Sequence, residues 1–357
     1  MTSKRILVFR IGSLGDTIVA IPAFWRIRQA FPHAHITFLS NSDNSTLGYI
    51  QPRSILPESG LFDEWLTYPT GGLIGFAKLF YDIRRNKYDE LIYLMPRTRT
   101  VGQLKRDQFF FRASGIKVLK GIDYLFTNRL ELNAKYSLPE VDREGDFIWD
   151  CLTADGIPLA DAERSFDLRL TQQEVAFAEN WLNSQIPDIE KKPIVAVAPG
   201  SKWNSKKWGE DKYFETVSHL IKGKDIFPIV FGGPEDKTLG DRLIARWGRG
   251  ANAAGQLNVR QAAAALIDCD LYLGNDTGTM HIAAAAGCRC VAIFASIDWN
   301  GRWFPAGNGH TSFRTRIECE GCHLTDCPIG NECLSRISVE QVVWASTEAL
   351  SKHGAAN

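Results

Sequence analysis

Short apolar runs alternate with helical patterns along this chain, and the alternation occurs twice. In the first half the apolar runs are RILVFRI (5–11), HITFLS (35–40) and DELIYLM (89–95), with helical patterns such as 16–31 and 75–87 between them. Strands that alternate with helices pair in parallel and form a sheet covered on both faces. The first half therefore predicts a doubly wound α/β domain.

The same alternation of apolar runs and helical patterns begins again after a polar segment at 186–193 that ends in a proline. Its apolar runs span 193–200, 226–233, 271–276 and 290–295, with helical patterns at 210–223, 238–248, 258–269 and 277–287. We predict a first domain over 1–168, a helix and linker over 169–193, a second domain over 194–335 and a closing helix over 336–357. We therefore expect two doubly wound domains separated by a cleft. Ligands of such sheets bind beyond the carboxyl ends of the strands.

Charge and hydropathy limit the partners of the chain. Lys plus Arg equals Asp plus Glu, 41 each over 357 residues, which gives no global signal for nucleic acid. The opening residues MTSKRILVF carry too short an apolar run for a signal peptide. No stretch approaches the ~18 uninterrupted apolar residues of a spanning helix. These features predict a cytoplasmic protein.

The stretch FRIGSLGDTIVAIPAF (9–24) combines a strand end, a glycine turn and a helix start. This arrangement usually indicates a phosphate cradle, yet the helix begins with an acid, Asp16. The carboxylate has two interpretations. It can charge and cap the first helical turn, as acids often do, or it can act as a general base.

Three loops of the second half follow predicted strands and carry polar residues. They are PGSKWNSKKW (199–208), GGPED (232–236) and GNDTGTMHIAAAAG (274–287). Lysines, backbone amides, a hydroxyl and carboxylates at the ends of parallel strands suit a nucleoside diphosphate. Phosphate binds at a helix N-terminus, and an acid can accept the ribose hydroxyls.

Taken in order, GSLGDTIVAIPA, PGS…KKW, GGPED and GNDTGTMHIAAAAG resemble the motifs of glycosyltransferase family 9, the lipopolysaccharide heptosyltransferases and their relatives. The resemblance runs from about residue 4 to the C-terminal helix. It implies the GT-B fold, in which two Rossmann-like domains face each other, the first binding the acceptor and the second an ADP-sugar. It also implies that catalysis needs no cofactor.

The resemblance implies roles for individual residues. Asp16 matches the catalytic base, and Lys206 matches the lysine that stabilises the leaving diphosphate, with Lys207 as the neighbour that can be confused with it. Either Glu235 or Asp236 reaches the ribose. The full set of expected donor-binding residues is Ser201, Lys202, Lys207, Gly232, Glu235, Asp236, Asp276, Thr277, Gly278 and His281. For His281 the alternative is a helix residue packed against the sheet.

Acceptor binding is expected in the first domain. The expected residues are Gly12, Ser13, Gly15, Arg97 and Arg99. The two arginines belong to a basic run over 97–120, which is either a solvated face or a surface for an acidic acceptor or an anionic membrane. The segment GGLIGFAKLF (71–80) is either a core helix or a membrane-surface helix, and we favour the core. Peripheral contact with the inner face of the cell membrane follows from the second interpretation.

Four of the eight cysteines are crowded into CEGCHLTDCPIGNEC, with spacing C-x2-C-x4-C-x5-C. Cys319, Cys322, Cys327 and Cys333 can close a tetrahedral site for a structural zinc or iron ion. In the related autotransporter heptosyltransferases such a loop binds iron. The alternative is a loop of reduced thiols without metal, and both remain open here. Asp268 and Asp270 match an Asp-x-Asp metal pattern formally, but they precede a strand and are interpreted as structural.

Together these features predict an inverting glycosyltransferase. It would move a heptose or similar sugar from an ADP-sugar to a hydroxyl of a saccharide or glycolipid acceptor, with lipopolysaccharide core as the expected acceptor. The alternatives are a transferase or epimerase that uses a UDP- or GDP-sugar, and a non-catalytic protein that binds a nucleotide sugar.

Overall fold

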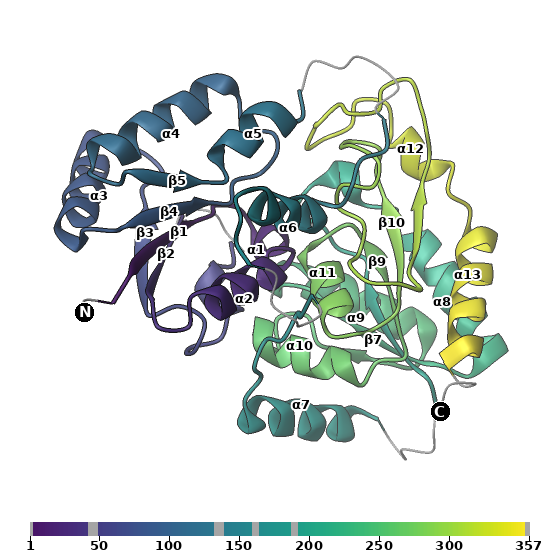
Figure 1. The fold of residues 1–357 in the computed structure, drawn as a ribbon. Helices are drawn as coiled ribbons and strands as arrows, with labels where there is room; N and C mark the ends of the chain where they lie inside the picture. The colour runs from purple at the N-terminus through teal and green to yellow at the C-terminus, as the bar shows by residue number, and fades with distance from the viewer. Residues whose placement is uncertain (1–2, 42–48, 132–138, 159–163, 187–191, 354–357) are drawn as a thin grey trace. The chain divides into compact units, whose positions relative to one another are not determined.

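The computed structural model describes residues 3–41, 49–131, 139–158, 164–186 and 192–353. The chain divides into two compact units. The first comprises 1–133 and 144–168, and the second comprises 134–143 and 169–357. Each unit is built on its own parallel sheet (Figure 1). Among the described residues, no helix is both long enough and apolar enough to cross a lipid bilayer.

The first unit contains a five-stranded sheet in the order β3-β2-β1-β4-β5. Its strands are β1 (Arg5–Phe9), β2 (His35–Asn41), β3 (Glu64–Tyr68), β4 (Glu90–Tyr93) and β5 (Val118–Lys120). Each hydrogen-bonded pair runs parallel. This is the strand order of a dinucleotide-binding sheet without its sixth strand, and the direction of the winding reverses between β1 and β4. Ligand sites of such sheets form at that reversal.

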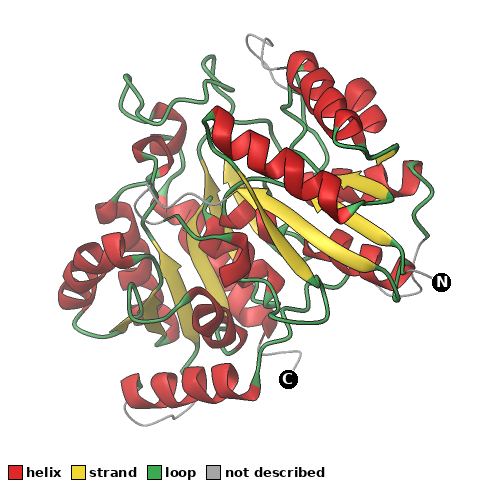
Figure 2. Cartoon of the chain, turned by 90° about the vertical axis from the view of Figure 1, so that its left-hand side faces the viewer, coloured by secondary structure: helices red, strands yellow, loops and turns green. Residues whose placement is uncertain are grey.

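Helices cover both faces of the first sheet (Figures 1 and 2). They are α1 (Leu14–Ile18), α2 (Ile21–Ala30), the 3-10 turn η1 (Pro52–Ser54), α3 (Leu73–Asn86), α4 (Val101–Ala113), α5 (Ile122–Asn128) and α6 (Glu144–Ala154). The expectation of one continuous helix over 16–31 is wrong, because α1 ends at Ile18 and α2 begins at Ile21. Pro22 lies in the first turn of α2, where its missing N–H costs no helical hydrogen bond.

The second unit contains a six-stranded sheet in the order β11-β10-β9-β6-β7-β8. Its strands are β6 (Ile194–Ala198), β7 (Phe227–Val230), β8 (Ala251–Asn252), β9 (Leu271–Asn275), β10 (Cys290–Phe294) and β11 (Thr311–Arg314). Each hydrogen-bonded pair is again parallel. Counted from β6, this is the same strand order as a complete dinucleotide-binding sheet, and the winding reverses between β6 and β9.

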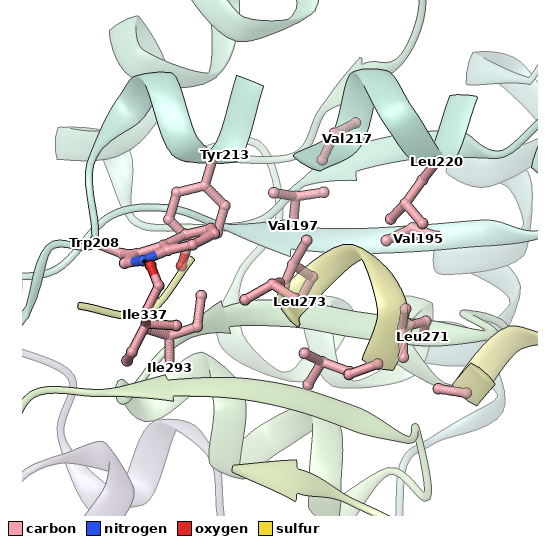
Figure 3. Packing of buried hydrophobic residues seen from close by; sticks show 14 of the residues in the cluster. Val195, Val197, Trp208, Tyr213, Val217, Leu220, Leu271, Leu273, Ile293 and Ile337 are labelled. Atoms are coloured by element: carbon pink, nitrogen blue, oxygen red, sulfur yellow. Dashed lines mark hydrogen bonds between the residues drawn. The ribbon is translucent and has the colours of Figure 1, made fainter. Parts of the chain in front are cut away.

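The helices of the second unit begin with α7 (Gln172–Gln185). The others are η2 (Asn204–Lys206), α8 (Glu210–Lys224), η3 (Pro234–Asp236), α9 (Lys237–Trp247), α10 (Val259–Ile267), α11 (Gly278–Ala285), α12 (Glu332–Ser335) and α13 (Val339–His353). Trp208 and Tyr213 pack edge to face, with ring centroids 5.2 Å apart, at one end of a buried cluster that includes Val197, Leu273 and Ile293 (Figure 3). This cluster fixes the loop after β6 to the body of the sheet.

The segment expected to be a helix and linker includes a helix that belongs to the second unit. Thr171 caps α7 by accepting a hydrogen bond from the Glu174 N–H. Glu174 forms a 2.5 Å ion pair with Arg260 of α10. A second connection, between the Val141 N–H and the Asn300 carbonyl (2.9 Å), places the short 139–143 segment in the second unit. Most of the polar break at 186–193 lies outside the described residues.

Candidate functional site

The predicted motifs flank the reversal point of each sheet. In the first unit, the loop with Gly12 and Asp16 follows β1, and the loop with Arg97 and Arg99 follows β4. In the second unit, the Lys206 loop follows β6 and the Asp276 loop follows β9. Because β1 adjoins β4 and β6 adjoins β9, each pair of loops leaves neighbouring strands at the same edge. Each sheet thus has one candidate binding edge.

Asp16 takes part in the start of α1. Its Oδ2 accepts hydrogen bonds from the backbone N–H of Ser13 (2.8 Å) and from the Ser13 hydroxyl (2.9 Å). Its other oxygen, Oδ1, lies 3.8 Å from the Arg10 guanidinium. Only one carboxylate oxygen of Asp16, Oδ2, therefore takes part in the cap with Ser13. The second oxygen is outside the cap, and the side chain is partly exposed, so capping and base chemistry are compatible.

Gly12 is required at its position by backbone and by space. Its φ is +148°, and a Cβ there would collide with the side chain of Asp16. Only glycine allows the turn to pass this close to the carboxylate. The Gly12 N–H donates to Asn41 Oδ1 (2.9 Å) and its carbonyl accepts from the Tyr49 hydroxyl (3.0 Å). Gly15 is buried inside α1. The turn is thus fixed on both sides of Ser13.

Arg10 is a residue of this edge that the sequence reading missed. Its side chain is 1% exposed, its Nε donates to the Asp16 carbonyl (2.6 Å), and its Nη1 donates to the Leu94 carbonyl (2.7 Å). It therefore ties the loop after β1 to the loop after β4. The available signal was a charged residue at the end of an apolar strand and directly before the glycine turn.

Arg97 and Arg99, both expected to bind the acceptor, make internal contacts. Arg99 lies 3.3 Å from Asp107, a buried carboxylate that also accepts from the Tyr93 hydroxyl (2.7 Å). Burial and the nearby Asp107 charge raise the pKa of Tyr93, which keeps its hydroxyl protonated as the donor. The Arg97 guanidinium lies over the Phe147 ring, 4.4 Å from its centroid. Their acceptor role stays a prediction.

Lys206 and Asp276 meet in the second unit. Lys206 Nζ lies 2.7 Å from Asp276 Oδ2, and the two side chains are 21% and 8% exposed. Lys207 instead points to Asn204 Oδ1 (2.8 Å) and is exposed. The two adjacent lysines are thereby distinguished, because only Lys206 turns toward the loop after β9. The ammonium has three donors, so its bond to Asp276 leaves donors for an anion.

Asn275 holds these loops together and was also missed. It is fully buried, and its Oδ1 accepts from the Tyr213 hydroxyl (2.8 Å) and the Trp208 N–H (3.3 Å). Its Nδ2 donates to the carbonyls of Pro199 (2.8 Å) and Gly200 (3.3 Å). One amide therefore fixes both ends of the loop that carries Lys206. The sequence signal was the asparagine inside the apolar run LYLGND.

The α11 N-terminus lies directly after Asp276. Thr277 is the N-cap, and its side chain accepts no hydrogen bond from the described backbone of the first turn. The first N–H groups of a helix lack intrahelical partners and favour an anion. Gly278 opens the helix, and His281 is buried with its ring 6.1 Å from that of Trp303. His281 is thus a buried helix residue, and its donor-binding role stays a prediction.

The loop after β7 carries Glu235 and Asp236, either of which was expected to reach the ribose, and their surroundings differ. Glu235 is exposed, whereas Asp236 is half-buried and accepts from the Gly233 N–H (3.2 Å). A Cβ at Gly200 or Gly232 would collide with the Asp236 carboxylate, so this side chain fills the space between the loops after β6 and β7. Burial, reinforced by the nearby Glu235 charge, raises the pKa of Asp236.

The remaining residues of the Lys206 loop are held by the cysteine-rich loop. Ser205 is buried, its N–H donates to the Thr325 carbonyl (2.9 Å), and its hydroxyl donates to the Leu324 carbonyl (2.6 Å). Asn331 donates to the Asn204 carbonyl (2.9 Å). The Ser201 hydroxyl accepts from the Trp203 N–H (3.2 Å), and Lys202 is exposed. The cysteine-rich loop thus supports the segment just before Lys206.

The four cysteines of that loop line one cavity, together with Ser205 and Asn331. Burial and the three neighbouring thiols raise the pKa of Cys319. Among the described side chains, however, no group of three or more ligands is arranged to hold a metal ion. The described side chains therefore do not fit the structural zinc or iron ion that was one of the two alternatives, and the proposed reaction does not depend on one.

The Asp-x-Asp pattern lies at the opposite edge of the second sheet. Asp270 precedes β9, and its Oδ2 accepts from the Ile194 N–H (2.7 Å) at the start of β6. It fixes the amino ends of two adjacent strands, away from the edge where Lys206 and Asp276 meet. Asp268 caps the end of α10. Both residues are placed as the structural interpretation expects.

Comparison with known proteins shows the family of the chain. The family model described as "Glycosyltransferase family 9 (heptosyltransferase)" matches residues 77–332. Among curated proteins, the chain is 23% identical over 297 residues to the lipopolysaccharide core heptosyltransferase OpsX of Haemophilus influenzae, which covers 82% of this chain and 79% of that protein.

Solved structures of similar fold cover almost the entire chain. A family 9 glycosyltransferase from Veillonella parvula superposes with a TM-score of 0.74 at 19% identity, over 99% of both chains. The E. coli heptosyltransferase WaaC, solved with ADP-2-deoxy-2-fluoro heptose, superposes with a TM-score of 0.62 at 16% identity, over 96% of this chain and 99% of that one. The fold class predicted from the sequence is confirmed.

Proposed function

Because the chain belongs to glycosyltransferase family 9, the heptosyltransferase family, we propose that it transfers a heptose from an ADP-heptose to a saccharide hydroxyl of the lipopolysaccharide core. The donor is suggested by the E. coli neighbour solved with an ADP-heptose analogue. The acceptor is suggested by the name of the Haemophilus relative. The transfer would invert the anomeric centre.

The observation that carries the proposal is the Lys206–Asp276 pair at the start of α11. A cation 2.7 Å from its partner carboxylate lies where the loops after β6 and β9 meet, at the reversal point of the second sheet. The helix that follows offers its first N–H groups. A diphosphate has the charge and the acceptor atoms that this combination binds.

Asp16 would act as the base. The acceptor hydroxyl attacks the anomeric carbon while its proton moves to a carboxylate oxygen of Asp16, and Oδ1 is the oxygen outside the Ser13 cap. Arg10 and Ser13 hold the carboxylate in one orientation. General-base catalysis of this kind contributes roughly two to four orders of magnitude in rate.

Lys206 would stabilise the departing ADP. As the bond from the anomeric carbon to the phosphate oxygen breaks, negative charge develops on the diphosphate. Lys206 Nζ, kept in place by Asp276, and the N-terminus of α11 would meet that charge. The reaction as proposed draws its positive charge from the protein, so it uses no resident cofactor.

The other donor contacts follow from the loops around this pair. Glu235 is the exposed acid of the β7 loop and the better placed to reach ribose hydroxyls, while Asp236 supports the loop from inside. Ser201, Lys202 and Lys207 line the loop after β6, and Gly232 lets the two loops approach. Thr277, Gly278 and His281 complete the set, with Thr277 as the residue nearest the helix start.

The test is a melting panel of the purified full chain with ADP, UDP, GDP and AMP. A ligand that binds only the native state raises the melting temperature, so ADP should raise it more than UDP or GDP. Incubation with ADP-heptose and a core saccharide should then yield ADP and a heptosylated product of inverted configuration. A shift with UDP or GDP alone would reject the ADP-heptose donor, and no shift with any nucleotide would favour a binding protein of another kind.

A further inference from the structure

The first turn of α3 exposes apolar side chains that a core helix would bury. Leu73 is 89% exposed and Ile74 is 88% exposed. Gly71 and Gly72 precede them, and a Cβ at either glycine would meet no atom within 4 Å. The expectation that the 71–80 segment belongs to the core is therefore wrong for this first turn.

The rest of α3 separates into two faces. Leu79 and Ile83 are buried against the first sheet, and Phe76 is half-buried. The opposite stripe, at helical spacing, consists of exposed side chains in which apolar and basic residues alternate: Ile74, Lys78, Tyr81 and Arg85. The core contacts are thus satisfied without the exposed apolar residues, whose outward position needs another explanation.

Helix α4 continues this surface. Phe110 packs against Phe76 and Phe80 of α3, with ring centroids 6.2 and 6.0 Å apart, so the two helices lie side by side (Figure 1). Phe109, the preceding residue, is 76% exposed. It shares one face of α4 with exposed Lys105 and Arg112, at spacings of four and three residues. We call the exposed faces of α3 and α4 the α3–α4 surface.

The α3–α4 surface is strongly basic although the chain as a whole is neutral. The two helices carry six exposed basic residues and two acidic residues. The basic residues are Lys78, Arg84, Arg85, Lys105, Arg106 and Arg112, and the acidic ones are Asp82 and Asp107. Asp107 is 3% exposed and already paired with Arg99 and Arg106. The charge that the surface presents to solvent is therefore positive.

We propose that the α3–α4 surface docks on an anionic lipid bilayer. Leu73 and Ile74 would enter the boundary between headgroups and acyl chains, with Tyr81 and Phe109 at headgroup level. The basic side chains would contact the negatively charged lipids. Apolar residues interleaved with one sign of charge are typical of helices that lie on membranes, and charge complementarity favours lipid over a second copy of this equally basic surface.

The surface begins at the same edge of the sheet as Asp16. Helix α3 starts after the carboxyl end of β3, and α1 starts after the carboxyl end of β1, two positions away in the same parallel sheet. Neighbouring strands lie about 4.8 Å apart, which places the two strand ends roughly 10 Å apart. If the proposed function holds, docking would present a lipid-linked acceptor to the edge that carries Asp16.

The experiment is sedimentation of the full chain with vesicles in the absence of donor and acceptor. One vesicle set is phosphatidylcholine, and the other adds phosphatidylglycerol. The chain should bind the anionic vesicles and lose that binding at high salt. Leu73→Ser with Ile74→Ser should weaken binding about tenfold or more, and Lys78→Gln with Arg85→Gln should weaken it by roughly fivefold for each charge.

Two matched controls lie on the second unit. Trp344→Ser removes an exposed apolar side chain and Lys222→Gln an exposed basic one, and neither should change vesicle binding. The melting temperature and its shift with ADP report folding of every variant. Equal binding of wild type and of both double variants would overturn the proposal, as would no vesicle binding at all or equal binding to both vesicle sets. A dimer that the Leu73→Ser, Ile74→Ser variant abolishes, without vesicle binding, would assign the surface to self-association instead. None of these results depends on turnover, so they leave the proposed transfer reaction untouched.

Discussion

Each sheet carries an aspartate in a loop at its reversal point, Asp16 after β1 and Asp276 after β9. The surroundings of the two carboxylates differ. Asp16 lies after β1, bonded to Ser13 through one oxygen and 3.8 Å from Arg10 through the other. Asp276 lies after β9, 2.7 Å from Lys206. Beside Asp16 the cation is Arg10, which is itself buried and bonded to backbone carbonyls. Beside Asp276 it is Lys206, a partly exposed lysine with donors to spare.

The N-termini of the helices after these two loops differ as well. Helix α1 has five residues and its first turn is occupied by the Ser13–Asp16 cap. Helix α11 has eight residues, mostly small, and its N-cap side chain bonds to no described N–H of the first turn. Strand order therefore places the two sites, and we propose that the local side chains decide whether each one suits a hydroxyl or a phosphate. Five substitutions test this difference, given from the largest expected effect to the smallest.

Asp16→Asn should lower kcat about a thousandfold, because the amide keeps the shape of the cap but cannot accept the proton. Turnover of ADP-heptose with a core saccharide measures it. Asp123→Asn, which removes an exposed first-turn acid from α5, is the matched control and should retain full activity. An Asp16→Asn enzyme as active as this control would leave Asp16 with capping alone.

Lys206→Met should lower kcat by roughly two to three orders of magnitude through loss of charge stabilisation on the leaving diphosphate. It should also leave the Asp276 carboxylate without its cation. Lys207→Met removes the adjacent, exposed lysine, which is a proposed donor contact but points to Asn204 and not to Asp276. Its kcat should therefore stay close to that of the wild type, with any loss confined to KM for the donor. Equal losses in the two variants would remove the distinction that the structure draws between them.

Asn275→Ala should lower the free energy of unfolding by about 3 kcal/mol, since a buried hydroxyl and two carbonyls lose their partner. Denaturant unfolding measures this change. Asn252, less completely buried in the same unit, bonds to Lys237 and Asp241 instead. Asn252→Ala should lower stability but leave the affinity for ADP unchanged, whereas Asn275→Ala should weaken both.

Ser205→Ala should cost about 1 kcal/mol of stability, the contribution of one hydrogen bond to the Leu324 carbonyl. If the cysteine-rich loop positions Lys206, kcat falls a few-fold as well. Ser335→Ala is the control, because its exposed hydroxyl bonds only within α12. A Ser205→Ala enzyme with reduced stability and unchanged kcat would make the loop a purely structural support.

Asp236→Asn should have the smallest effect, an increase in stability of less than about 1 kcal/mol at neutral pH. Burial raises the pKa of Asp236 in the folded state, so its ionised form is destabilising, and this cost disappears as protonation occurs at lower pH. The advantage of Asn over Asp in melting temperature should therefore shrink as the pH falls. An advantage that grew toward acid pH would contradict the assigned direction.

The long apolar runs made most of the sheets predictable. β1, β4, β6, β7, β9 and β10 lie within predicted runs, and β2 extends one residue beyond its run. These strands were predictable because buried parallel strands need continuous apolar sequence. The edge strands β3, β5, β8 and β11 were not identified. They are short or only half-buried, as in EWLTY of β3, and pairing with a neighbouring strand fixes them more than composition does.

The site was predictable as a set of loops and less so as a set of contacts. Sequence order placed Asp16, Lys206 and Asp276 after their strands, but the choice of Lys206 over Lys207 depends on how η2 turns. Arg10 and Asn275 were missed because each looks like a strand residue, and their roles come from carbonyl groups distant in sequence. Leu73 and Ile74 fit the helical pattern of their segment, which does not reveal that their side chains are exposed.

The roles proposed for the two sheets are tested most directly by calorimetric titration of ADP into Asp16→Asn and Lys206→Met beside the wild type. If the nucleotide binds to the second sheet alone, Asp16→Asn should bind ADP as tightly as the wild type while its turnover is lost. Lys206→Met should bind ADP at least about tenfold more weakly, as loss of a charge-assisted contact implies. ADP affinity reduced by Asp16→Asn and preserved in Lys206→Met would contradict the division of roles between the two sheets.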